Sequence, residues 1–340
     1  MVRATVTWGV ALAVSLFAHG FAVSAEPAAT QDDVKAALAK ALPLLKKGAE
    51  GHVAQRTCFA CHNQAIPILA LTTARDRGFA FHDEDLKKQT EFIAAFLEKN
   101  RDNYREGKGQ GGQVDTAGYA LFALEAGQWK ADATTEAVVE YLLLRDKDAD
   151  HWRATSKRPP SEASDFTTTA LALRALRPWG TPAQKGRIEK RIDAVRVWLH
   201  KATAKDTEDR VYRLWGLQTV GAADKELRAA AEDLLRTQRK DGGWAQTTEL
   251  ESDAYATGSA LVALHRAGGL ATSEPAYRRG VAFLLKDRQD DGSWLVRSRS
   301  KPFQTYFESG FPHGKDQFIS MAASGWATTA LALALPPAGK

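Results

Sequence analysis

Short apolar segments that end at a glycine recur along the chain. In three of them an Ala-Leu pair is followed by a glycine eight residues after the alanine, starting at Ala70, Ala172 and Ala260. A fourth segment, which starts at Ala120, is one residue shorter. Because Ala and Leu favour helix and glycine favours the position just past a helix end, each segment predicts a buried helix that stops at its glycine.

Polar stretches lie between these apolar segments. They have the pattern of amphipathic helices, with charged side chains gathered on one face. The clearest of them cover residues 187–201, 225–237 and 277–287. The chain therefore predicts a repeating unit made of a polar helix, a turn and an apolar helix, and an all-α fold.

A tryptophan turn marks the repeat. At Trp244 and Trp294 two leucines precede the tryptophan by ten and nine positions, and an Asp-Gly pair lies just before it; Trp152 keeps the leucine spacing but has lost the Asp-Gly pair. Trp244 lies 92 residues after Trp152 and 50 before Trp294, which indicates a period in the mid-forties with one unrecognisable copy between the first two. Such a period is typical of a repeat array within one domain.

The turn at residues 238–244, Gln-Arg-Lys-Asp-Gly-Gly-Trp, resembles the repeat motif of the squalene hopene cyclases, in the terpenoid cyclase and protein prenyltransferase superfamily. The later copy has Arg288 where that motif has its glutamine. The resemblance covers most of the chain and implies an α/α toroid of about five or six helix pairs, as a single domain over residues 26–340. In that family apolar inner helices surround a central cavity.

The first 25 residues predict a signal peptide. They carry one early positive charge at Arg3, an apolar stretch over about residues 6–23, and the small residues Val-Ser-Ala at 23–25. Cleavage there lowers the net charge from +5 to +4, because Arg3 is the only charged residue removed. Later segments are not apolar enough to span a membrane, and the basic residues are scattered among acidic ones. We expect a periplasmic or secreted bacterial protein that neither spans a membrane nor binds nucleic acid.

Only two cysteines occur in the chain, and both belong to the sequence Cys-Phe-Ala-Cys-His at residues 58–62. This is the attachment sequence of a c-type haem. Cys58 and Cys61 are therefore predicted to form thioether bonds to one covalent haem c, with His62 as the proximal iron ligand. A redox disulfide stays open as the alternative, whereas a zinc site lacks a second cysteine pair and a thioredoxin-type site lacks a βαβ setting.

Alignment of the repeats puts His62 next to the start of the first inner helix. The predicted haem then sits at one rim of the toroid, over the mouth of the cavity. Residues 295–318, between the last tryptophan turn and the last inner helix, form a long segment that is too aromatic for disorder. A closed ring would bring this segment towards the cysteines, so Arg297 and Arg299, with Lys301, are candidates to pair with the haem propionates.

The sixth iron ligand is not marked by any motif. His313 is the first candidate, and Met321, which begins the last inner helix, is the second. A five-coordinate iron with an open site is an equal alternative. His52 and His82 lie in polar stretches and are expected to be solvated.

A single aspartate occupies the segment Gln-Val-Asp-Thr-Ala at residues 113–117, where the squalene cyclases that this chain resembles have Asp-x-Asp-Asp-Thr-Ala. The resemblance makes Asp115 a candidate acid for protonating an alkene. The favoured alternative is that Asp115, Asp165 and Asp253 cap inner helices. The zinc set of the prenyltransferases is not matched, because Tyr255 stands where their Asp-x-Cys motif has its thiol.

These residues support three hypotheses about function. The leading one is a periplasmic c-type haem protein that serves in electron transfer or redox sensing with an unknown redox partner. The second is an enzyme that acts on an apolar, terpenoid-type small molecule in the central cavity, through Asp115 or through an open iron. The third is a binding module whose haem reports redox state. Whether the protein is an enzyme stays open at this point.

Overall fold

Two kinds of helix alternate along the chain in the computed structural model, which describes residues 29–302 and 304–339. The predicted signal peptide at residues 1–25 lies outside this range, as does Phe303. The outer helices are α1 (Gln31–Gln55), α3 (Asp83–Glu98), α6 (Ala133–Leu144), α8 (Lys185–Lys201), α10 (Asp224–Leu235) and α12 (Pro275–Asp287). The inner helices are α2 (Ile66–Arg75), α5 (Gln113–Ala126), α7 (Asp165–Trp179), α9 (Thr207–Thr219), α11 (Ala254–Arg266) and α13 (Gln317–Leu333). A short helix, α4 (Arg101–Arg105), lies between α3 and α5.

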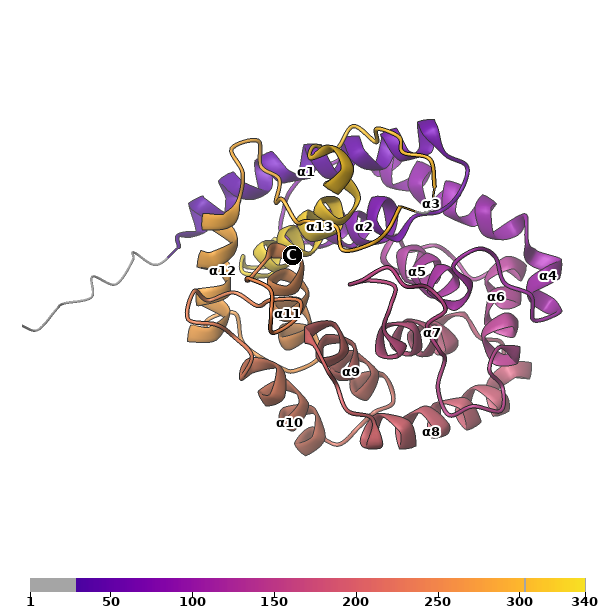
Figure 1. Ribbon diagram of the computed structural model, residues 1–340. Coiled ribbons are helices and arrows are strands. Elements are labelled where there is room, and N and C mark those ends of the chain that lie inside the picture. Colours follow the sequence, from indigo (N-terminus) through magenta and orange to yellow (C-terminus); the bar gives the residue numbers. More distant parts are fainter. Residues whose placement is uncertain (1–28, 303, 340) are drawn as a thin grey trace, which may run out of the picture.

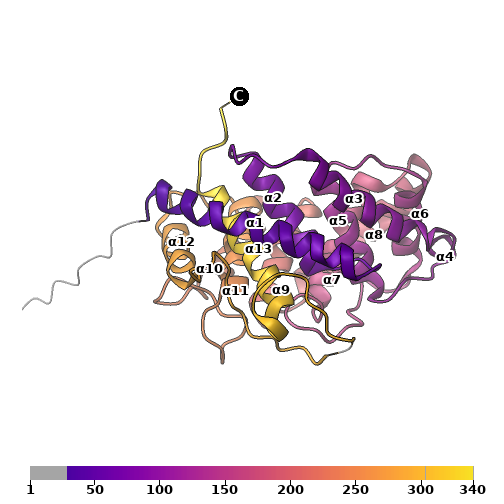
Figure 2. The same ribbon diagram turned by 90° about the horizontal axis from the view of Figure 1, so that it is seen from above.

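The inner helices form a closed ring. Each contacts the next along the chain, and α2 contacts both α5 and α13, which joins the first pair to the last. The outer helices lie around this ring (Figure 1), and α1 runs along the side of it (Figure 2). The predicted α/α toroid is confirmed, with six helix pairs in the part of the chain that the structure describes.

The inner helices bury a larger share of their residues than the outer helices do, as the sequence pattern predicts. Eleven of the thirteen residues of α11 are buried, whereas α10 buries only three of twelve. An inner helix is covered on all sides by its neighbours and so needs apolar or small residues throughout, while an outer helix buries one stripe. No helix in the described residues is long and apolar enough to cross a membrane.

The tryptophan turns fasten each outer helix to its inner partner. Trp152, Trp244 and Trp294 are fully buried, and each indole N–H donates to the carbonyl of the leucine ten residues earlier, over 2.7–3.0 Å. Each backbone N–H donates to a hydroxyl on the following inner helix, from Thr169, Thr257 and Ser324 respectively. The unrecognised copy of the repeat is the pair α8 and α9, whose turn has no tryptophan.

Two of the glycines that end inner helices provide space for packing. Gly127 and Gly180 have negative φ values of −81° and −75°, so neither has the left-handed backbone of a typical glycine stop. A Cβ on Gly180 would lie 2.3 Å from Cδ1 of Ile188, and one on Gly127 would lie 2.3 Å from Cγ2 of Thr90. The glycines let the outer helices approach the ends of the inner ones.

The predicted aspartate caps are correct at one position of three. Asp253 is the N-cap of α11 and accepts the backbone N–H of Ala256 at 2.9 Å. At α7 the prediction is wrong, because Ser164 is the N-cap and Asp165 is the first helical residue. Asp115 is not a cap either, because the N-cap of its helix, α5, is Gly112.

Candidate functional site

Three adjoining cavities open at the N-terminal ends of the inner helices, which form one rim of the ring. The first, named here the rim cavity, has a volume of about 590 Å³ and lies between the start of α2 and the start of α5. Its wall includes His52, Cys58, Cys61, His62, Gln110, Asp115, Tyr119, Arg158, Glu162 and Gln304. The Cys-Phe-Ala-Cys-His segment at residues 58–62 therefore faces a cavity of a size that ordinarily holds a small molecule or cofactor.

The two cysteines reach this cavity from an irregular stretch that follows α1. A π-helical turn at Cys61–Ala65 then leads into α2, and the side-chain oxygen of Gln64 accepts the backbone N–H of Ala60 at 3.0 Å. Turns of this kind are frequent at functional sites. Both cysteines are free thiols, with Cys58 half-buried and Cys61 buried. The irregular stretch and the turn thus present two unbonded sulfur atoms and His62 to one space.

The surroundings of Cys61 and His62 keep both side chains neutral. The Cys61 thiol donates to a carboxylate oxygen of Glu162 at 3.1 Å, and burial together with that carboxylate raises the pKa of the thiol well above its usual value. Burial lowers the pKa of His62 to about 3, so its imidazole is neutral. The ring packs against Phe318, with centroids 5.0 Å apart. Neutral imidazole is the form that binds a metal.

His52 also lines the rim cavity, and the expectation that it is solvated is wrong. Only 2% of its surface is exposed, and its Nε2 lies 2.7 Å from the Cys58 carbonyl oxygen. Its place in the buried series of α1, seven residues after Leu45 and three after Ala49, is the signal that could have revealed this. His82 is exposed, as expected.

Asp115 comes to the same cavity from the first turn of α5. Its side chain is 1% exposed and turns inward, where one oxygen accepts the hydroxyl of Thr168 on α7. The other oxygen, Oδ2, is buried without a hydrogen-bond partner. The N-cap of α5 is Gly112, so the capping role expected for Asp115 is not observed. Burial raises the pKa of Asp115 to about 7, which makes it a carboxyl group that holds a proton near neutral pH.

Arg158 and Glu162, in the loop between α6 and α7, form an ion pair in the wall of the rim cavity. Sequence reasoning missed both, because a loop between repeats carries no periodic signal that places it over a cavity. Together with His62 and Gln304 they also line a second cavity of about 410 Å³, whose other walls include Tyr306 and the start of α13.

Residues 305–309, in the long segment before α13, pack against the end of α1, as ring closure predicts. Arg56 donates to the carbonyl of Thr305 at 2.6 Å, and the guanidinium lies 4.2 Å from the ring centroid of Phe307. A Cβ on Gly51 would lie 1.9 Å from the carbonyl oxygen of Ser309. The last repeat therefore adjoins the first directly at the motif.

The basic residues predicted for the propionates lie elsewhere. Arg297 is exposed and pairs with Asp316 at 2.9 Å. Arg299 donates to the side-chain oxygen of Gln246 at 2.9 Å and lines the third cavity. Neither lines the rim cavity, where Arg158 is the arginine in the wall.

The two residues predicted as sixth ligands are also engaged away from the rim cavity. Nε2 of His313 lies 2.7 Å from the hydroxyl of Ser293, in the last tryptophan turn. The sulfur of Met321 accepts the amide N–H of Asn63 at 2.9 Å and is fully buried. The structure brings Cys58, Cys61, His62 and Asp115 to the rim cavity but does not bring His313 or Met321 there.

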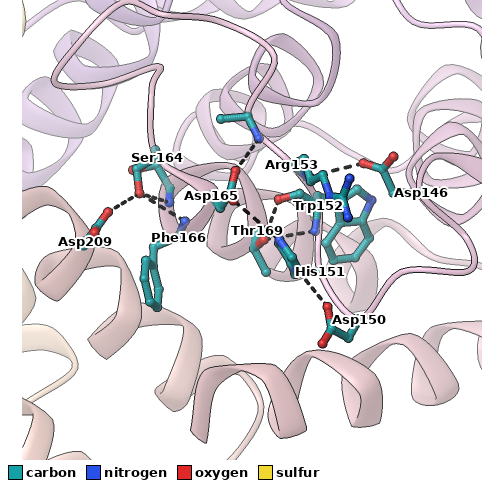
Figure 3. A network of polar contacts seen from close by, with 12 residues as sticks. Asp146, Asp150, His151, Trp152, Arg153, Ser164, Asp165, Phe166, Thr169 and Asp209 are labelled. Carbon is teal, nitrogen blue, oxygen red and sulfur yellow. Dashed lines mark hydrogen bonds and ion pairs between the residues drawn. The ribbon is translucent and has the colours of Figure 1, made fainter. Parts of the chain in front are cut away.

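The third cavity, of about 410 Å³, lies beside α7, α8 and α9 and has acidic walls. Figure 3 shows its polar contacts: Ser164 donates to Asp209 at 2.6 Å, and His151 lies between Asp150 and Asp165, at 2.6 and 3.5 Å. These contacts fasten the turn before Trp152 and the loop before α7 to the starts of the inner helices.

The middle of the ring is filled by side chains. Between α5, α7, α9 and α13 the cavity measures only about 20 Å³, and its walls include Arg174, Trp215 and Trp326. The central cavity implied by the family resemblance is thus narrow at this level. The three larger cavities described above lie at the rim.

The side chains of the rim cavity are of the kinds that a covalently attached haem needs. It has two free thiols at the required spacing, a neutral imidazole next to the second thiol, and an arginine in its wall. Among the described residues no group of three His, Cys, Asp or Glu side chains is placed to hold a metal ion.

Comparison with known proteins gives the fold. No family model matches the chain, and no curated protein matches it. Among solved structures, the type II terpene cyclase MstE from Scytonema is similar to it. The apo enzyme is 13% identical with a TM-score of 0.53, over 89% of this chain and 98% of the other.

Variants of the same enzyme give similar values with ligands bound. One in complex with merosterolic acid A, its product, is 15% identical with a TM-score of 0.53, over 89% of this chain and 97% of the other. One in complex with geranylgeranyl dihydroxybenzoate, its substrate, is 14% identical with a TM-score of 0.54, over 90% and 99%. The fold is terpene cyclase-like. At this identity the likeness extends to the architecture and not to the chemistry.

Proposed function

We propose that this protein binds one haem c covalently in the rim cavity and serves in electron transfer or redox sensing. The observation that carries the proposal is that Cys58, Cys61 and His62 all line one cavity of about 590 Å³. When bound, the haem would supply a one-electron iron centre. The partner would be a redox protein or an apolar small molecule.

The chain's own residues would hold the group in three ways. Cys58 and Cys61 would anchor it through their sulfur atoms, and His62 would ligate the iron through a neutral ring. The π-helical turn holds Cys61 and His62 on one element that is continuous with α2. Arg158 would face the anionic edge of the group. The predicted signal peptide supports export to the periplasm or beyond, where covalent attachment takes place in ordinary c-type cytochromes.

The experiment is expression in a bacterium equipped for c-type haem maturation, followed by haem staining on a denaturing gel and a pyridine haemochrome spectrum. The wild-type chain should keep its haem through denaturation, and the Cys58→Ala, Cys61→Ala double variant should lose it. Asp115→Asn is the matched control, since it changes the same cavity without touching an anchor. Equal staining of wild type and double variant would end the proposal.

A second candidate function is acid-initiated chemistry on an apolar substrate. It is favoured by Asp115, whose carboxyl holds a proton near neutral pH, has an unpartnered oxygen and lines the same cavity. The carboxyl would give its proton to one carbon of an alkene, whose π electrons form the new C–H bond. Loss of a proton from the resulting cation would then regenerate the acid. The terpene cyclase-like fold and the segment at residues 113–117 support this candidate.

One comparison separates the two candidates. Asp115→Asn should abolish turnover of a polyprenyl substrate if the acid chemistry operates, and should leave covalent haem unchanged if the cavity holds haem. Either occupant would lie in the rim cavity, which Asp115 and the two cysteines share, and haem there would take the place of a polyprenyl chain. We place the haem first because it accounts for both cysteines and His62 together.

A further inference from the structure

His52 lines the rim cavity and has a buried ring nitrogen without a hydrogen-bond partner. The side chain belongs to the last turns of α1, is 2% exposed, and lines the cavity together with Cys58, Cys61 and His62. Its Nδ1 is buried and has no hydrogen-bond partner. Buried polar atoms are almost always paired, so an unpaired one at a cavity wall points to a partner that the cavity would supply.

The hydrogen bond of the other nitrogen fixes which form of the ring is present. Nε2 lies 2.7 Å from the carbonyl oxygen of Cys58, and a carbonyl oxygen only accepts, so Nε2 carries the hydrogen. A neutral imidazole has one N–H, which leaves a lone pair on Nδ1. Histidines that bind metals typically donate their other N–H to a backbone carbonyl in this way, which sets both the tautomer and the ring orientation.

Aromatic rings hold the His52 side chain in place. Phe92 meets it edge-on at 6.3 Å between centroids, and Phe307 lies at 5.7 Å. Phe307 in turn contacts Phe318 at 5.2 Å, and Phe318 contacts His62 at 5.0 Å. The two histidines are thus supported by one connected set of rings.

The residues considered earlier for the sixth position do not offer an equivalent atom. His313 is bonded to Ser293 and Met321 to Asn63, and neither lines the rim cavity. We propose that His52, through Nδ1, would be the sixth ligand of the iron when the haem is bound. This inference rests on the proposed function, because it requires the covalent haem at Cys58 and Cys61.

The test uses the full chain after haem maturation. Ferric and ferrous absorption spectra and electron paramagnetic resonance should show a low-spin iron with two nitrogen ligands in the wild type. In His52→Ala the low-spin signal should be lost, carbon monoxide should bind, and added imidazole should restore the low-spin spectrum by filling the vacated space. His52→Gln, which keeps a donor for the Cys58 carbonyl, should also lose the low-spin signal.

Two controls and three outcomes complete the design. His313→Gln and Met321→Leu should both keep the wild-type spectrum. A wild-type iron that is five-coordinate, or a His52→Gln protein that stays low-spin, would overturn the assignment even though haem is covalently bound. A wild-type chain that carries no covalent haem would instead overturn the proposed function, and with it this inference.

Discussion

The replacement of Asp115 by asparagine should make the stability of the protein less dependent on pH. The folded-state pKa of about 7 lies above the ordinary value of 3.8, because the side chain is 1% exposed. The folded protein therefore binds the proton more tightly than the unfolded chain does. Stability from this group is complete below about pH 4 and is lost as the pH rises through about 7.

The magnitude follows from the size of the shift. From 3.8 to about 7 is roughly three units, and each unit is worth about 1.4 kcal/mol. The wild-type protein should lose on the order of 4 kcal/mol of unfolding free energy between pH 4 and pH 8 relative to Asp115→Asn. The asparagine keeps the shape and an oxygen that can accept from Thr168, but it cannot ionise. Domains of this kind are stable by only about 5–15 kcal/mol, so the loss is measurable.

The assay is urea denaturation of both proteins, followed by far-ultraviolet circular dichroism across this pH range. The contributions of titrating groups that do not interact with Asp115 cancel in the difference between the two proteins. Thr168→Val is a second test, because the Thr168 hydroxyl lowers the pKa of Asp115 and its removal should move the pH midpoint upwards. A wild-type minus variant difference that stays constant with pH would refute the account of Asp115 as a buried, protonated carboxyl.

Two further predictions concern the repeats and the closure of the ring. Trp244→Phe should destabilise the protein by about 2–4 kcal/mol, because the buried carbonyl of Leu234 loses its donor and a cavity is left; urea denaturation measures this, and an effect below about 1 kcal/mol would contradict it. Gly51→Ala should cost about 1–3 kcal/mol, because its Cβ meets the backbone of Ser309, whereas Gly186→Ala, where nothing lies within 4 Å, should be neutral or slightly stabilising. Equal thermal midpoints for the two glycine variants would contradict the packing of residues 305–309 on α1.

The repeating architecture could be predicted from the sequence because each unit restates the same pattern. The alternation of apolar and amphipathic segments fixed the inner and outer helices within a few residues, as at 187–201 against Lys185–Lys201 for α8. The spacing of Trp152, Trp244 and Trp294 located the repeat between Trp152 and Trp244 whose turn lacks a tryptophan. Periodicity is local information, and burial follows from it directly.

The composition of the site was only partly predictable, because it depends on which loops meet at the rim. Arg158 and Glu162 reach the rim cavity through a loop without periodic signal, while Arg297 and Arg299, which looked suitable by charge, are held by Asp316 and Gln246. The single aspartate at 115 lies in the first turn of a helix, where sequence alone does not decide between a cap and an inward side chain.

Intact mass of the mature wild-type chain, recorded under denaturing conditions after expression with c-type haem maturation, tests the central claim most directly. The account predicts a chain that begins at Glu26 and carries the added mass of one haem, and a Cys58→Ala, Cys61→Ala chain without that mass. A wild-type chain at its bare polypeptide mass would contradict the account, leaving a terpene cyclase-like toroid whose rim cavity serves another ligand.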